Sequence, residues 1–139
     1  MFKKNIIGLM VLSATVFAAP VHAVYVPSID KFHPDFVLSN DTVTSFTGMV
    51  NDRVCTGVFG SQGIIHPHSV KVVHYSELNL ACGTNIEACK IDLYPNDDCS
   101  GNKIGSVTLD VNEGVTGIVS GTSFALTAPS PFEIQIDKI

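Results

Sequence analysis

The segment Lys90-Ile91-Asp92-Leu93-Tyr94 alternates polar and apolar residues, and two later segments repeat the pattern. They are Ser106-Val107-Thr108-Leu109-Asp110-Val111 and Phe132-Glu133-Ile134-Gln135-Ile136-Asp137. Successive side chains of a β-strand point to opposite faces of its sheet. The alternation therefore predicts three strands, each with one face on a core and the other in water.

Less regular runs rich in Val, Thr and Phe cover residues 43–50, 54–59, 69–75, 115–120 and 123–126. Turn residues separate these runs. About eight short strands between turns is typical of an all-β fold, a small antiparallel β-sandwich, immunoglobulin-like or similar. Helical spacing of apolar residues is not sustained after the N-terminal leader, so no helix is expected. The core is expected to include Phe36, Phe46, Phe124 and Phe132.

The N-terminal 23 residues predict a secretory signal peptide. Lys3 and Lys4 precede an uncharged apolar run over residues 6–19, and Val21-His22-Ala23 places small residues where signal peptidase requires them. We expect Sec-type cleavage near Ala23, a secreted or periplasmic protein, and no stable membrane insertion after cleavage, because the apolar run is too short to span a bilayer comfortably. The remainder divides into an N-terminal arm over residues 24–40 and the β-sandwich domain over residues 41–139.

Charge argues against nucleic acid as a partner. The chain has 8 Lys and Arg against 13 Asp and Glu. Loss of Lys3 and Lys4 with the leader leaves six scattered basic residues, for a net charge of −7. Phosphate binding needs clustered Lys and Arg, so we expect no nucleic-acid binding.

The four cysteines predict two disulfides, because an even number in an exported chain is typical of oxidised pairs. Three pairings are open. We favour Cys82 with Cys89, which closes a short loop, and Cys55 with Cys99, which ties an early strand to a later hairpin. A zinc site is the alternative, although these spacings lack the paired C-x2-C of zinc ribbons.

Histidines supply the candidate metal ligands. In His66-Pro67-His68 the two rings would point to the same side of an extended backbone and offer two imidazoles to copper or zinc, with His74 or His33 as a further ligand. Pro67 cannot donate to a central ladder, so the motif is expected on an edge or in a loop. Surface histidines without a metal are the competing interpretation.

Residues for other chemistry are sparse. Ser28-Ile29-Asp30-Lys31 matches S-x-x-K without its companion motifs, so we expect no enzyme and no organic cofactor. Asn96-Asp97-Asp98 and Asp110-Val111-Asn112-Glu113-Gly114 resemble calcium loops, but tight turns favour the same residues. The second segment also lacks the distal glutamate of a calcium loop. We therefore favour turns at both places.

The string Cys89-x-Ile91-x-Leu93-Tyr94-Pro95, followed by Cys99-Ser100-Gly101 and a β-run, resembles small exported proteins of Gram-negative bacteria, some of them secreted by pathogens. The resemblance covers about a quarter of the chain and rests on hairpin residues. It therefore carries no functional residue over to this sequence.

These features together favour a non-catalytic exported β-sandwich that binds a protein or glycan partner outside the cytoplasm, such as a secreted bacterial host-interaction factor. If Phe59, Tyr75 and Tyr94 face outward, they would form an aromatic patch for such a partner; the alternative is that they cap the core, as aromatic residues at strand ends more often do. One alternative is a periplasmic or secreted copper- or zinc-binding protein that uses the His66-Pro67-His68 motif. Another is a structural subunit of a surface fibre.

Overall fold

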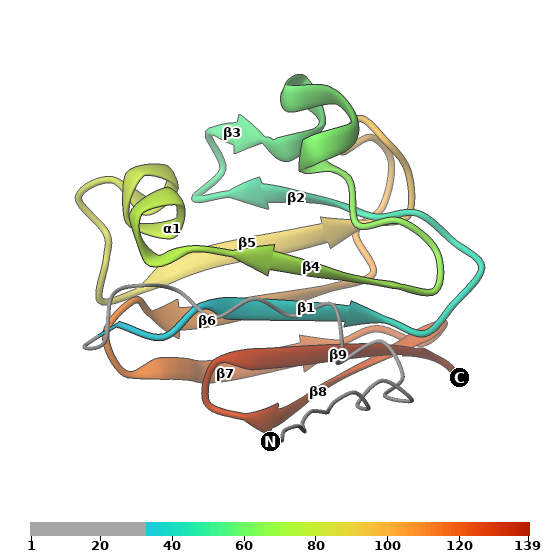
Figure 1. The fold of residues 1–139 in the computed structure, drawn as a ribbon. Helices are drawn as coiled ribbons and strands as arrows, with labels where there is room; N and C mark the ends of the chain where they lie inside the picture. The colour runs from blue at the N-terminus through green and yellow to red at the C-terminus, as the bar shows by residue number, and fades with distance from the viewer. Residues whose placement is uncertain (1–32) are drawn as a thin grey trace, which may run out of the picture.

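A computed structural model describes residues 33–139, which form two β-sheets packed face to face. Figure 1 shows one sheet behind the other, with short helical segments along one edge. The predicted β-sandwich is confirmed. The predicted signal peptide and residues 24–32 of the predicted arm lie outside the described residues.

The four-stranded sheet has the order β4-β1-β9-β8. Its strands are β1 (Phe36–Asn40), β4 (Ser69–Val73), β8 (Phe124–Ser130) and β9 (Glu133–Lys138). Strand β1 pairs antiparallel with β4 and parallel with β9. The chain thus places an early strand beside its last one.

The five-stranded sheet is antiparallel and has the order β3-β2-β5-β6-β7. Its strands are β2 (Thr47–Val50), β3 (Val54–Cys55), β5 (Cys89–Tyr94), β6 (Gly105–Asp110) and β7 (Gly114–Ser120). The three segments with the clearest alternation become β5, β6 and β9, as predicted.

The core lies between the sheets and takes side chains from both. Phe46, directly before β2, is fully buried, and its ring meets the ring of Phe124 in β8 edge to face at a centroid distance of 5.0 Å. The other side chains of the core with at most 1% exposure are Phe36, Cys82, Cys89, Leu93, Val107, Leu109, Val111, Ile134 and Ile136. Phe36, Phe46 and Phe124 are therefore core residues as predicted, and Phe132 is partly buried against them.

Residues 36–40 of the predicted arm instead form β1, a correction to the domain boundary at residue 40. Phe36 and Leu38 point into the core, and β1 is hydrogen-bonded on both sides. Turn signals at Pro27 and His33-Pro34 dominate the sequence pattern of this region, whereas pairing with distant strands decides its structure.

Two short helical segments were not predicted. The strand that we expected over residues 54–59 ends at Cys55, and the chain continues as the 3-10 segment η3 (Thr56–Gly63). This segment contains three glycines, and glycine is a poor strand former. Expected strand at 69–75 ends at Val73, and α1 (Tyr75–Cys82) follows. Helix α1 buries only Leu78 and Cys82, too few apolar positions for a periodic signal.

The disulfides have the favoured pairing, Cys82 with Cys89 and Cys55 with Cys99. The first joins the end of α1 to the start of β5. The second joins the end of β3 to the β5–β6 connection. Within residues 33–139, none of the helices has the length and apolar character needed to cross a bilayer.

Candidate functional site

The two histidines of the His66-Pro67-His68 motif have separate partners. His66 Nε2 lies 3.0 Å from both the hydroxyl and the carbonyl oxygen of Ser61, whereas His68 Nδ1 lies 3.7 Å from Asp41 Oδ1. His68 has a φ of +50°, so the backbone is not extended there. The premise that both rings point to one side of an extended chain is therefore wrong, although the motif does lie in a loop.

His74, the third predicted ligand, is paired with a carboxylate instead. Its Nδ1 lies 2.9 Å from Asp35 Oδ1. In the part of the chain that the structure describes, no three His, Cys, Asp or Glu side chains are grouped to hold one metal ion. The copper or zinc hypothesis therefore gains no support from His66, His68 and His74.

Asp35 is a buried carboxylate that sequence reasoning missed, because it falls in the segment predicted as an arm. It directly precedes β1, beside the Phe36–Val73 pair at which the β1–β4 ladder ends. Only 2% of Asp35 is exposed, and its Oδ2 has no hydrogen-bond partner among the described residues. The hydrogen bond to Asp35 raises the pKa of His74; burial opposes this, and the charges of Asp35 and Glu77 add to it.

We expect Asp35→Asn to lower the pKa of His74, because it removes the carboxylate that stabilises the imidazolium. In the wild type the raised folded-state pKa means that the pair stabilises the fold fully below pH 6.5, the ordinary value, and loses this contribution as pH rises through the folded-state pKa. NMR titration of the His74 ring in both proteins measures the shift. An unchanged pKa would show that Asp35 does not act on His74.

A second buried carboxylate, Asp92, lies on the outer face of the five-stranded sheet, where the alternation predicts exposure to water. It is 3% exposed and accepts hydrogen bonds from Ser106 Oγ at 2.5 Å and from Lys103 Nζ at 3.3 Å. Burial favours a higher pKa, but these hydrogen bonds and the charges of Lys103 and Lys90 outweigh it and hold the pKa of Asp92 below its ordinary value. Ser106, Lys103 and Lys90 therefore compensate the buried charge of Asp92 on this face of the sheet, which is a structural role.

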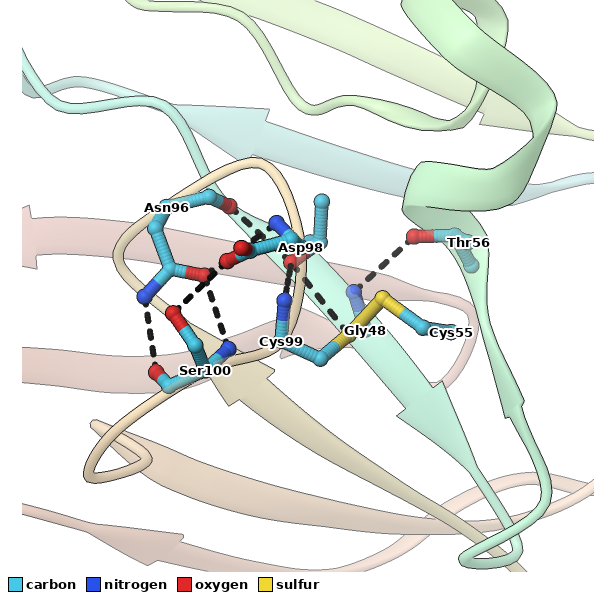
Figure 2. The surroundings of a disulfide bond; sticks show 8 residues. Gly48, Cys55, Thr56, Asn96, Asp98, Cys99 and Ser100 are labelled. Atoms are coloured by element: carbon cyan, nitrogen blue, oxygen red, sulfur yellow. Dashed lines mark hydrogen bonds between the residues drawn. A yellow bond between two sulfur atoms is a disulfide. The ribbon is translucent and has the colours of Figure 1, made fainter.

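The Cys55–Cys99 disulfide joins two loops into one surface, which we call the stapled platform: residues 56–63, which form η3, and residues 95–101 between β5 and β6. Figure 2 shows the hydrogen bonds that fix the second loop. Asn96 Oδ1 accepts from the backbone N–H groups of Asp98 and Ser100, at 3.3 and 3.1 Å. Thr47 Oγ1, from β2, accepts from the N–H of Cys99 at 3.2 Å.

The η3 segment is held against this loop and against β2. Thr56 Oγ1 accepts from the N–H of Gly48 at 3.0 Å (Figure 2). A Cβ at position 57 would lie 2.1 Å from the carbonyl oxygen of Asp97. The backbones of Gly57 and Asp97 can therefore approach this closely only because residue 57 is a glycine. Two residues after η3, Ile65 exchanges both backbone hydrogen bonds with Phe46, at 2.8 and 3.0 Å. Both ends of η3 are therefore anchored.

Between these anchors, η3 exposes two large apolar side chains, Val58 and Phe59, which we call the η3 tip. Val58 is 73% exposed and Phe59 is 65% exposed. Exposed apolar side chains on an ordered support are a feature of binding surfaces, because little entropy is lost when a partner covers them. Of the three aromatic residues predicted to face outward, Phe59 does so, while Tyr75 and Tyr94 are half-buried.

The two candidate calcium loops are closed by their own turns. Asp110 Oδ1 accepts from the backbone N–H groups of Asn112 and Glu113, at 2.8 and 3.2 Å. Asn96 does the same in the stapled platform. The interpretation of both segments as tight turns is confirmed, because the side-chain oxygens serve the backbone.

The chain matches a known protein family over nearly its whole length. The family model of the type II secretion system (T2SS) substrate NttC matches residues 2–139. The chain belongs to the NttC family. The protein is therefore an exported one, as the sequence predicts, and the NttC family assigns it to the type II secretion route.

A solved structure has the same fold. The crystal structure of the Legionella pneumophila type II secretion system substrate NttC matches with a TM-score of 0.60 and 22% sequence identity, over 76% of this chain and 97% of that chain. At this identity the match shows a shared fold. No curated protein sequence matches the chain.

Proposed function

We propose that this NttC family member is a non-catalytic secreted protein that binds a protein or glycan partner outside the cytoplasm through its η3 tip. The observation that carries the proposal is the exposure of Val58 and Phe59 on a segment that is anchored at both ends. Membership in a family of secretion substrates supports an extracellular place of action. The signal peptide predicted over residues 1–23 completes the proposed export route.

The anchoring of η3 favours a binding role for Val58 and Phe59 over exposure without a function. Aromatic side chains are enriched in interfaces, and a few of them supply much of the binding energy when a partner excludes water from them. A flexible loop would lose the freedom of several residues on binding, whereas η3 is held before the partner arrives. The energetic cost of exposing Val58 and Phe59 in water is then offset in the complex.

We expect the double substitution Val58→Ser, Phe59→Ser to reduce binding at least about tenfold, because truncating central aromatic side chains has effects of this size. The measurement uses fluorescently labelled protein, purified from culture medium, on intact cultured eukaryotic cells and on a glycan array. The intact mass of the same preparation is expected to equal that of a chain that begins at Val24. Prior digestion of the cells with protease or with glycosidases distinguishes a protein partner from a glycan.

Leu80→Ser is the matched control, because Leu80 on α1 is 85% exposed and lies outside the stapled platform. It should bind like the wild type. The proposal is wrong if the wild-type protein binds neither cells nor glycans, or if the two-residue variant binds as well as the control.

A further inference from the structure

We propose that the partner of the η3 tip is a protein surface that presents Lys or Arg side chains around an apolar pocket. This inference rests on the proposed function and narrows it to one class of partner. It follows from the chemistry that surrounds Val58 and Phe59 on the stapled platform.

The stapled platform combines an apolar centre with an acidic border. Asp97 and Asp98 are both exposed, and the backbone of Asp97 contacts Gly57, the residue directly before Val58. Residues 56–63 and 95–101 include no Lys or Arg. The ammonium group of Lys71, which lies outside the platform, donates to the carbonyl oxygen of Gln62 at the C-terminal end of η3 and keeps its charge there. Among the described residues, no ion pair joins a basic side chain to Asp97 or Asp98.

The loop holds the carboxylate of Asp98, and the backbone on either side of it, in place through its own hydrogen bonds. Asp98 Oδ1 accepts from Ser100 Oγ at 2.7 Å (Figure 2). Asn96 orders the backbone on either side, and Cys99 is tied to β2 and to Cys55. The backbone that carries the two carboxylates is therefore ordered before binding, and its contact with Gly57 holds it beside η3.

An ordered apolar centre with an acidic border is complementary to an apolar pocket with a basic border. Interfaces commonly place an apolar anchor at the centre and charged groups at the rim, where opposite charges speed association and exclude partners of like charge. Anionic glycans and anionic lipid surfaces would be repelled by Asp97 and Asp98. Neutral glycans would leave the two carboxylates without cations, so a basic protein surface fits best.

To test this, a phage-displayed library of random peptides is first depleted of phages that bind the Val58→Ser, Phe59→Ser variant. The remaining phages are then selected for binding to the full secreted protein. We expect enriched peptides to combine Lys or Arg with a large apolar residue. A synthetic copy of the most enriched peptide is then titrated by fluorescence anisotropy against variants. Asp97→Asn, Asp98→Asn should raise its Kd by about fivefold to twentyfold and flatten its salt dependence between about 0.05 and about 1 M.

The control is Glu87→Gln, Glu113→Gln, which changes the net charge equally. Both residues are exposed and lie in the α1–β5 and β6–β7 connections, outside the stapled platform. We expect less than about a twofold change in Kd from this control, because exposed charges at a distance are screened. In the test variant, the amide oxygen introduced by Asp98→Asn still accepts from Ser100 Oγ, so loss of binding would reflect charge.

Neutral or acidic peptides, the absence of any tip-dependent peptide, or an equal loss in the control variant would overturn the inference. Cell binding that depends on the η3 tip but is removed by glycosidases and not by protease would also overturn it, while leaving the proposed function intact. Failure of the wild-type protein to bind any cell or glycan would instead remove the proposed function itself.

Discussion

Replacement of Cys55 and Cys99 by serine is expected to lower the free energy of unfolding by about 4 kcal/mol and to weaken binding through the η3 tip. The disulfide joins residues 44 positions apart, and the chain-entropy treatment relates the stabilisation to the length of the loop that the bond closes. A domain of this size is stable by about 5–15 kcal/mol, so the variant would stay folded with a much reduced margin. Guanidinium unfolding without reductant measures the change.

The second disulfide provides the matched control. Cys82→Ser, Cys89→Ser opens a loop with a separation of 7 residues and should cost about 2.5 kcal/mol. It leaves the stapled platform closed, so binding should persist. Loss of Cys55–Cys99 instead frees η3 and the 95–101 loop, and the partner must then order several side chains at about 0.5–1.5 kcal/mol each. Equal binding by the two variants would show that the staple does not prepare the η3 tip.

The strands predicted most accurately were those whose sequence alternates on its own. Segments 90–94 and 106–111 carry their apolar residues at every second position, and each becomes a strand with that face buried. Cysteine pairing also followed from local facts, since a spacing of seven residues favours a closed loop between Cys82 and Cys89. These features depend on neighbours in sequence, so the sequence displays them directly.

What the sequence did not display depends on distant neighbours. Residues 36–40 become a strand because β4 and β9 flank them, and Asp35 becomes a buried partner of His74 through the same pairing. The helix α1 has two turns and two buried positions, which leave no periodic trace. The favoured Cys55–Cys99 pairing predicted that the two loops of the platform meet, but not the close contact of Gly57 with Asp97, forty residues apart, which turn composition alone cannot reveal.

Phe46→Ala is expected to destabilise the protein by about 3–5 kcal/mol, because truncating a fully buried Phe removes its transfer free energy and leaves a cavity. Phe46 precedes β2 of one sheet, and its ring meets that of Phe124 from the other, so the cavity would open between the two layers. Phe46 also exchanges both backbone hydrogen bonds with Ile65, which closes the segment that carries η3. Thermal and guanidinium unfolding measure the loss.

Phe59→Ala is the comparison for Phe46→Ala, because it makes the same Phe-to-Ala change at a side chain that is 65% exposed. The pair of variants distinguishes an effect on core packing from an effect on binding. Phe59→Ala should change the free energy of unfolding by less than about 0.5 kcal/mol, as is typical of surface positions, yet weaken binding. Phe46→Ala should show the opposite pattern, with reduced stability and unchanged binding by the folded fraction. If Phe59→Ala destabilised the fold as much as Phe46→Ala, the η3 tip would be part of the core, and the binding surface inferred from its exposure would be wrong.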